Sequence, residues 1–261
     1  MFNRDRDAKI NAVARMITNT DKIVIFTGAG VSTESGIPDF RSPGGIWTKF
    51  DPDDFTIQKF VSNEASRKKQ WKVLIEGGLF GKVEPNPAHY AIAELEQLGK
   101  LDCVITQNID NLHQKAGNKP ENVFELHGNM QWVVCMNCGR RYSTEDIIEK
   151  LKSGVEIPDC DTCSGMLKPD VVFFGESLPH ATLNAAIDHS KACDLFIAIG
   201  SSLVVTPAAF MPSYAVESGA KLVIINIGET PLDGKANTVI DGKAGDIMTK
   251  ILQRVKEVPC A

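Results

Sequence analysis

Four of the seven cysteines form two identical pairs whose spacing suits metal binding. Cys135-x-x-Cys138 is followed, after 21 intervening residues, by Cys160-x-x-Cys163. Two such knuckles bring four thiolates to one tetrahedral ion, as in a zinc ribbon. Because four cysteine ligands leave no coordination position for water, the predicted Zn²⁺ ion is structural, with one ion per chain. Two redox-active pairs are the alternative interpretation of the same spacing.

A glycine-rich segment after a short apolar run is a candidate phosphate-binding site. The run Ile23–Phe26 reads as a buried strand, and Gly28-Ala29-Gly30 then turns the chain. A strand, a glycine turn and a helix in this order present free backbone N–H groups where the helix dipole favours negative charge. Thr33 stands where the dinucleotide fingerprint has its third small residue. A turn that binds no ligand is therefore an open alternative.

The loop after this turn collects side chains that suit a reactive ligand. Within six residues it contains Asp39, Phe40 and Arg41. An arginine can hold a phosphate or carboxylate by two parallel hydrogen bonds, and a phenyl ring can keep water from a reacting centre. An ordinary dinucleotide-binding unit would continue its helix through these positions.

Polar side chains also follow the predicted strand at 103–106. Gln107, Asn108 and Asp110 come directly after it, with Ile109 between them. In doubly wound sheets, ligands bind beyond the carboxyl ends of the strands, so these residues would face the same crevice as the glycine turn. Their amide and acid groups suit a ligand with ribose hydroxyls and a carboxamide. A polar turn that caps a helix is the alternative.

Three further strand ends extend this candidate site. His127 follows the predicted strand 123–126 and is a candidate general base, because the unperturbed histidine pKa lies near neutrality. Gly200-Ser201-Ser202 forms a small, hydroxyl-rich turn after strand 195–199. Asn226 ends strand 221–226, where it is placed to bind a ribose. His89 lies in the first turn of a predicted helix, where we expect a packing or capping role.

The alternation of strands and helices around these motifs predicts an α/β fold with a doubly wound, parallel, Rossmann-like sheet. An apolar stripe at Ile10, Val13, Met16 and Ile17 indicates a helix at the N-terminus, and the segment 42–60 reads as a long loop. A further predicted strand, the fourth of six in chain order, covers 170–176. The other predicted helices cover 62–79, 87–98, part of 142–152, 178–190, 207–218 and 244–255.

A smaller zinc-ribbon and helical module interrupts this sheet. We predict a discontinuous Rossmann-like domain made of residues 1–45, 86–129 and 168–261. The small domain would combine a helical and loop insertion at 46–85 with the zinc-ribbon module at 130–167.

Size and charge restrict the class of protein. The 261 residues, 43% of them hydrophobic, suffice for one large α/β domain with an insertion. A net charge of −5 argues against a nucleic-acid partner. No apolar run is long enough to span a membrane, and the N-terminal segment lacks the apolar centre of a secretion signal. We therefore expect a cytoplasmic protein without a membrane partner.

Taken in order, these motifs resemble the sirtuin family over roughly residues 10 to 255, and the chain resembles a short, prokaryotic-type member. The order and spacing of the motifs carry this resemblance, because each motif alone is common. The matching segments are Gly28–Ser32, Gly36–Arg41, Thr106–Asp110 with His113, His127-Gly128, the two cysteine pairs, Phe173–Glu176, Gly200–Ser202 and Asn226.

The resemblance implies an NAD-dependent protein-lysine deacetylase that acts on an acetylated protein or peptide. NAD is consumed: the acetyl group passes from acetyl-lysine to ADP-ribose, and nicotinamide and O-acetyl-ADP-ribose are released. The implied NAD-binding residues are Gly28, Ala29, Gly30, Thr33, Asp39, Phe40, Arg41, Gln107, Asn108, Ile109, Asp110, His127, Gly200, Ser201, Ser202, Asn226, Ile227 and Asp246.

The resemblance also implies catalytic roles. His127 would take a proton from a ribose hydroxyl, and Asn108 and Asp110 would line the nicotinamide pocket, with Asp110 receiving the carboxamide. The segment Val172, Phe173, Phe174, Gly175 and Glu176 would pair with the substrate peptide as an added strand. The chain has no tyrosine before Tyr90, where the family's desuccinylases carry a Tyr-x-x-Arg pair. We therefore expect neutral acyl groups to be preferred.

Three other functions compete with this one. A mono-ADP-ribosyltransferase would use the same activation of NAD toward another nucleophile. A non-catalytic NAD-binding zinc scaffold would not need His127 together with Asn108 and Asp110, all of which are present. A zinc-ribbon nucleic-acid binder conflicts with the acidic net charge.

Overall fold

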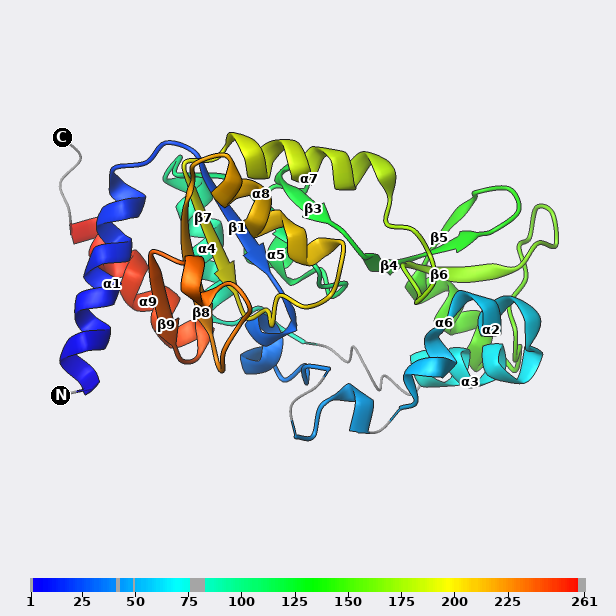
Figure 1. Cartoon of the computed structure of the whole chain (residues 1–261). Helices are drawn as coiled ribbons and strands as arrows, with labels where there is room; N and C mark the ends of the chain where they lie inside the picture. The colour runs from blue at the N-terminus through cyan, green and yellow to red at the C-terminus, as the bar shows by residue number, and fades with distance from the viewer. Residues whose placement is uncertain (1, 41–42, 49, 76–82, 258–261) are drawn as a thin grey trace.

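The computed structural model describes residues 2–40, 43–48, 50–75 and 83–257 and has two lobes (Figure 1). The large lobe is a six-stranded parallel sheet with helices on both faces. The small lobe is a three-stranded antiparallel sheet packed against short helices. The predicted α/β fold with a parallel sheet and a smaller cysteine-bearing module is thereby confirmed.

The strands of the large lobe are apolar because helices bury both faces of the sheet. Neighbouring strands run parallel in the order β3-β2-β1-β7-β8-β9. Every residue of β1 and β7 is buried, so these two strands form the centre. The strands are β1 (Ile23–Thr27), β2 (Leu101–Thr106), β3 (Val123–Glu125), β7 (Leu195–Ile199), β8 (Lys221–Asn226) and β9 (Thr238–Asp241).

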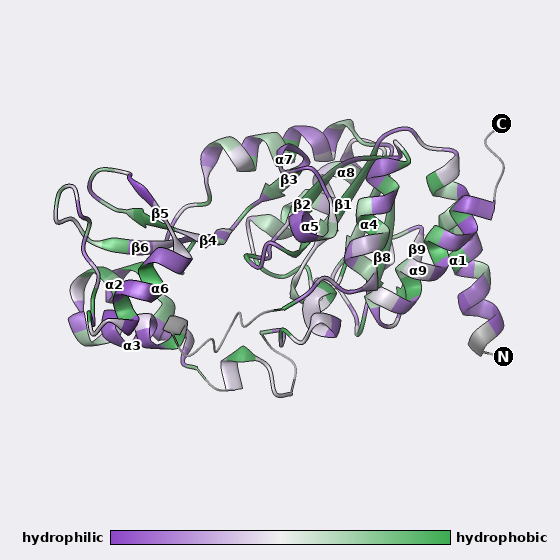
Figure 2. Cartoon of the chain, turned by 180° about the vertical axis from the view of Figure 1, so that it is seen from behind, coloured by the Kyte–Doolittle hydropathy of each residue, from purple (hydrophilic) through white to green (hydrophobic). Residues whose placement is uncertain are grey.

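Two helical layers cover this sheet. The first contains α1 (Phe2–Thr18), α4 (Pro87–Gln97) and α9 (Ala244–Glu257), whose apolar residues share one core with the sheet (Figure 2). The second contains α7 (His180–Ala192) and α8 (Met211–Glu217), the latter preceded by the short η5 (Ala208–Phe210). The predicted helices at these places are confirmed, and the stripe from Ile10 to Ile17 packs into the first core.

The small lobe joins two segments that lie far apart in the sequence. Its sheet has the order β5-β4-β6, and the apolar side of that sheet packs on Phe60 and Trp71 from the helices before it. Its elements are β4 (Gly128–Cys135), β5 (Arg141–Ser143), α6 (Thr144–Lys152), β6 (Leu167–Val171), η3 (Pro52–Phe55), α2 (Ile57–Ser62) and α3 (Glu64–Ile75). The short η2 (Ile46–Thr48) precedes them in the connection from the large lobe.

Two sequence predictions in this lobe were wrong in detail. The segment 42–60, predicted as a loop, contains η2 and η3 and most of α2. The strand predicted at 170–176 instead ends at Val171, and β6 pairs antiparallel with β4. It ends there because the Glu176 carboxylate accepts a hydrogen bond from the Phe173 N–H at 2.7 Å, and Gly175 turns the chain with a φ of +86°.

Several elements escaped the sequence patterns. These are β4, β5, β9, α5 (Leu112–Ala116), η4 (Pro120–Asn122) and η6 (Asp233–Lys235). The helix expected after the glycine turn is present as the 3₁₀-helix η1 (Ala29–Ser35). The predicted helix at 62–79 is present as α3 up to Ile75, and the rest lies outside the described residues. Among the residues described, no helix is both long and apolar enough to cross a membrane.

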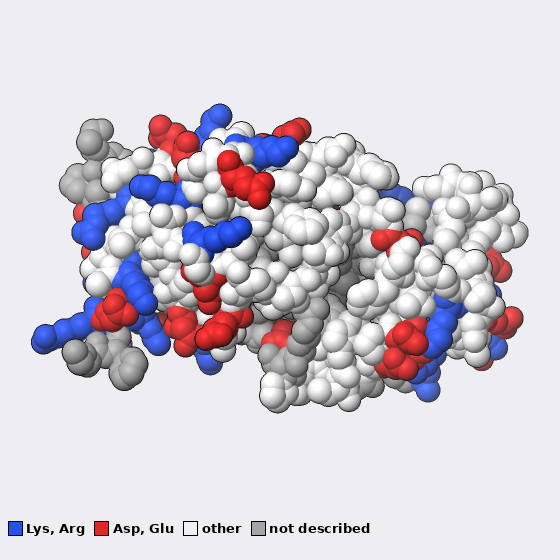
Figure 3. Space-filling model, in the orientation of Figure 1, with Lys and Arg blue, Asp and Glu red and all other residues white. Residues whose placement is uncertain are grey.

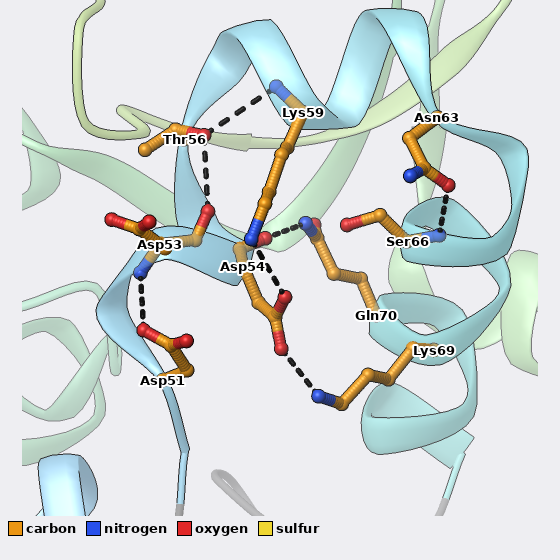
Figure 4. Close-up of polar contacts among 9 residues, drawn as sticks. All are labelled: Asp51, Asp53, Asp54, Thr56, Lys59, Asn63, Ser66, Lys69 and Gln70. Atoms are coloured by element: carbon orange, nitrogen blue, oxygen red, sulfur yellow. Dashed lines mark hydrogen bonds and ion pairs between the residues drawn. The ribbon is translucent and has the colours of Figure 1, made fainter.

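A partly buried carboxylate connects the helices of the small lobe (Figure 4). Asp54, whose side chain is 18% exposed, accepts hydrogen bonds from Lys59 of α2 and Lys69 of α3. Its backbone oxygen accepts another from Gln70. The lysine contacts, above all the one from Lys69, lower the pKa of the Asp54 carboxyl.

We predict that Asp54→Asn lowers the free energy of unfolding by about 0.5–1 kcal/mol at pH 7, because it removes one charge from two ion pairs. A carboxyl with a lowered folded-state pKa stabilises the fold above its unfolded pKa and loses this effect in acid. Urea denaturation should therefore show the difference shrinking as the pH falls below about 3.9. Asp53→Asn, at the exposed neighbouring residue, is the control. An equal loss in both variants, or one that does not change in acid, would contradict the prediction.

Candidate active site

Three glycines bring the turns after β1 and β7 into direct backbone contact. The Gly30 N–H donates to the Gly200 carbonyl at 2.8 Å, and the Gly28 N–H donates to the Ile199 carbonyl at 3.1 Å. A Cβ on Gly30 would lie 2.8 Å from the Gly200 Cα, and one on Gly200 would lie 2.3 Å from the Val31 nitrogen. Gly200 also has a φ of +62°. The glycines are therefore needed for this contact, whether or not a phosphate binds nearby.

The residues after β2 fold back onto the glycine turn. Asn108 donates from its side-chain nitrogen to the Gly28 carbonyl at 3.2 Å and to the Ser32 hydroxyl at 3.1 Å. Ser32 donates in turn to one oxygen of Asp110 at 2.7 Å, and the other oxygen accepts the Leu112 N–H at 3.0 Å. Both carboxylate oxygens keep free lone pairs for a further donor. Burial raises the pKa of the Asp110 carboxyl.

His127 lies where β3 passes into β4, at the junction of the two lobes (Figure 1). Its Nδ1 lies 2.8 Å from the Gln107 carbonyl oxygen, so Nδ1 is the donor and Nε2 carries the free lone pair. Burial lowers the pKa of His127, which keeps the ring neutral at neutral pH. The Gln107 side chain donates to the Ser201 hydroxyl at 2.8 Å. The strand ends of β2, β3 and β7 are thus joined by hydrogen bonds.

Two buried histidines contact hydroxyl groups of the glycine turn and of the strand before it. His89 caps α4 together with Asn86, and its Nε2 lies 3.5 Å from the Ser32 hydroxyl. His113 contacts the Thr27 hydroxyl through Nε2 at 2.9 Å. Burial lowers the pKa of His89 to about 4 and that of His113 well below its usual value, so both rings are neutral. The capping role expected for His89 is confirmed.

Aromatic side chains gather beside the loop that follows the glycine turn. Phe40 is 39% exposed, and its ring centroid lies 5.2 Å from that of Trp47. Trp47 also contacts Phe174, at 5.8 Å between centroids. The surface is hollowed between the two lobes (Figure 3). Arg41, the predicted phosphate ligand of this loop, lies outside the described residues. The backbone oxygen of Asp39 accepts a hydrogen bond from the Ile46 N–H.

The other predicted NAD-binding residues are spread over several further elements. Asn226 ends β8 and donates to the Ile227 and Gly228 carbonyls, and Ile227 is 67% exposed. Asp246, in the first turn of α9, pairs with Lys250 at 3.0 Å. Ala29 and Thr33 lie in η1, Ser202 is exposed after β7, and Ile109 packs into the small-lobe core.

The segment 172–176 connects the lobes through its backbone. The Val172 N–H donates to the His127 carbonyl at 2.8 Å, and Phe174 pairs with Phe55 and Ile57. An ion pair between a buried lysine and a partly exposed carboxylate holds the segment: Lys168 lies 3.0 Å from Glu176 and also donates to the Val171 carbonyl at 2.5 Å. The lysine nitrogen stands 4.5 Å from the centroid of Phe173, which is itself buried.

The four cysteines of the two pairs meet at one end of the small-lobe sheet. Their sulfur atoms lie within 4.8 Å of one another, and two of the distances are 3.6 and 3.7 Å. A regular ZnS₄ tetrahedron with Zn–S bonds of about 2.3 Å has sulfur–sulfur edges of about 3.8 Å. The geometry of Cys135, Cys138, Cys160 and Cys163 therefore fits a structural Zn²⁺ ion.

Three residues of this site were not singled out from the sequence. Ser32 joins Asn108 to Asp110, Glu34 accepts the Gly245 N–H at 2.7 Å and so ties η1 to α9, and Lys168 holds the segment 172–176. Of these three residues, only Ser32 could have been recognised from the sequence, because its hydroxyl comes two residues after the second glycine of the turn.

Comparison with known proteins identifies relatives of the whole chain. The model of the Sir2 family matches residues 28–207. The "NAD-dependent protein deacetylase 1" of Pyrobaculum aerophilum is 47% identical over 95% of both chains. A solved structure described as "Sir2-p53 peptide-NAD+" has a TM-score of 0.83 and 39% identity, covering 95% of this chain and 98% of that one. A Sir2 complex with deacetylated p53 peptide and 3'-O-acetyl ADP-ribose has a TM-score of 0.85 and 40% identity, covering 94% and 97%.

We predict that chelation of Zn²⁺ lowers the melting temperature of the protein, because metal binding at four thiolates is coupled to folding of the small lobe. Differential scanning calorimetry with and without a chelator measures this effect. Zinc added back should restore the transition. An unchanged melting temperature after the metal is removed, verified by elemental analysis, would contradict the structural role.

Proposed function

The chain belongs to the Sir2 family, and on that premise we propose that it is an NAD-dependent protein-lysine deacetylase. It transfers the acetyl group of acetyl-lysine to ADP-ribose and releases nicotinamide and O-acetyl-ADP-ribose. The observation that carries this proposal is the hydrogen-bonded meeting of Asn108, Ser32 and Asp110 with the glycine turn, beside a neutral His127.

The residues at the strand ends fit NAD as a cosubstrate. Bound NAD supplies an electrophilic ribose carbon from which nicotinamide leaves. We propose that Asp110 accepts the carboxamide N–H, because its oxygens keep free lone pairs and Ser32 and the Leu112 N–H orient them. Asn108 would fix the wall of the same pocket, and Phe40 would keep water from it.

His127 is proposed as the general base. Its Nδ1–H is held by the Gln107 carbonyl, which leaves Nε2 free to accept a proton from a ribose hydroxyl. Because the lowered pKa keeps the ring neutral, the base is in its active form at neutral pH. The hydrogen bond between the His127 carbonyl and Val172 places this base beside the proposed peptide segment.

The substrate peptide is proposed to bind along 172–176. The backbone of Phe174 already pairs with Phe55 and Ile57, so the peptide would add to a partly formed strand arrangement. The ion pair between Lys168 and Glu176 makes Lys168 a positioning residue for this segment. Neutral acyl groups, the domain boundaries given above and a cytoplasmic location remain proposals from the sequence.

We predict that His127→Ala lowers kcat for deacetylation by about 10²–10⁴-fold, the usual contribution of a general base. Product masses from NAD and an acetyl-lysine peptide give the rate. NAD binding, measured by calorimetry, should persist in the variant, and His180→Ala on the exposed start of α7 is the control. If the wild-type enzyme transferred ADP-ribose to unacetylated protein and transferred no acetyl group, the protein would instead be a mono-ADP-ribosyltransferase.

The wild-type enzyme should lose activity in acid, because protonation of His127 removes the base. Its lowered pKa places the midpoint of this loss below 6.5, the value of an unperturbed histidine. A profile of kcat/KM against pH measures the midpoint. A midpoint above 6.5, or a profile that is the same in His127→Ala, would contradict the assignment.

We predict that Lys168→Met raises KM for the acetylated peptide about tenfold, equivalent to about 1.4 kcal/mol, because it frees Glu176 and the segment 172–176. KM for NAD should stay close to the wild-type value. The exposed Lys221→Met serves as the control. Equal changes in both KM values would indicate a general loss of structure instead of a positioning role.

A further inference from the structure

A second cluster of metal-ligating side chains lies at the start of β2, outside the active site and the four-cysteine centre. It contains Asp102, Cys103 and His189, whose ligand atoms all lie within 4.8 Å of one another. His189 Nδ1 and an oxygen of Asp102 share a hydrogen bond of 2.5 Å. A metal ion bound to both atoms would displace the proton between them and separate them to about 3.3 Å, the edge of a tetrahedron with bonds of about 2.0 Å. The cluster joins a strand to a helix that comes 86 residues after Cys103 in the sequence.

An irregularity in the sheet creates this cluster. Consecutive residues of a strand normally point to opposite faces, which would separate Asp102 from Cys103. Here Ile23 pairs with Leu101 and Val24 with Cys103, so Asp102 is an extra residue without a partner on β1. Such a bulge re-aims a side chain, and it places Asp102 and Cys103 together on the face covered by α7.

The helix α7 supplies the third ligand from above. Its apolar residue Ala186 is buried in the same core as Cys103, and His189 follows within one turn. The His189 ring also contacts Phe124 of β3, at 4.9 Å between centroids. The side chains of Asp102 and His189 are each 34% exposed, so solvent reaches these two residues. Cys103, at 1% exposure, forms the buried side of the cluster.

A nucleophilic role for Cys103 does not fit this environment. Burial and the charge of Asp102 raise the pKa of its thiol, as burial raises that of nearby Cys193 to about 12. A reactive cysteine needs a lowered pKa and access to a substrate. Metal coordination needs no such access: a divalent cation would displace the thiol proton to solvent and balance the charge of Asp102.

We propose that Asp102, Cys103 and His189 form a second metal site that binds Zn²⁺ through one oxygen, one sulfur and one nitrogen ligand. Zinc accepts this mixed set in tetrahedral geometry, with water in the fourth position on the exposed side. The site lies at the opposite end of β2 from Gln107, and the five residues from Asp102 to Thr106 span about 13 Å. Its role is to clamp α7 to β2, independently of the proposed reaction.

The number of metal ions per chain tests this proposal. Protein with its four-cysteine centre loaded is dialysed against buffered Zn²⁺ and examined by native mass spectrometry. Wild type should carry two ions per chain, and both Cys103→Ala and His189→Gln should carry one. His180→Gln on the same helix and Cys193→Ala in the same core should keep two, because neither residue belongs to the cluster.

Two further measurements, cobalt absorption and melting temperature, are made on wild type and variants that are folded. Co²⁺ added to the zinc-loaded wild type should give a thiolate-to-cobalt absorption band that is missing in Cys103→Ala. Added Zn²⁺ should raise the melting temperature of the wild type but not that of His189→Gln. One ion per chain in the wild type, or two ions in both cluster variants, would overturn the proposal.

Discussion

The contact between two backbone turns is the constraint on which the rest of the site depends. The turns after β1 and β7 approach so closely that Gly30 and Gly200 share a hydrogen bond with no room for a side chain on either. This contact fixes the Gly28 carbonyl, which accepts the Asn108 amide, and Ser201, which accepts the Gln107 amide. The ends of β1, β2 and β7 are thereby held together.

The same network couples the two lobes. Gln107 touches Ser201 through its side chain and His127 through its carbonyl, and His127 leads directly into β4 of the small lobe. The His127 carbonyl also accepts the Val172 N–H, where the chain leaves the small lobe after β6. The zinc centre lies far along β4 from this junction, so its influence on the site passes through the packing of the small lobe and not through any contact with the reacting groups.

Much of this arrangement was predictable from the sequence, for specific physical reasons. Buried parallel strands are continuous apolar runs, so β1, β7 and β8 were recognisable, and paired cysteine knuckles indicate a metal centre whatever surrounds them. The strands β4 to β6 were not, because their buried and exposed residues do not alternate regularly. The bond from Ser32 to Asp110 joins residues 78 positions apart, so no local window of sequence contains it. Lys168 and Glu176 are only eight residues apart, but the turn at Gly175 that brings them together does not follow the period of a strand or a helix.

The central claim is that these strand ends consume one NAD for each acetyl group removed. The most direct measurement quantifies nicotinamide, deacetylated peptide and O-acetyl-ADP-ribose together over a time course with NAD and an acetyl-lysine peptide. The account predicts equal amounts of the three products at every time point and none of the deacetylated peptide when NAD is omitted. Deacetylation without NAD, or nicotinamide release that leaves the acetyl group on lysine, would contradict it.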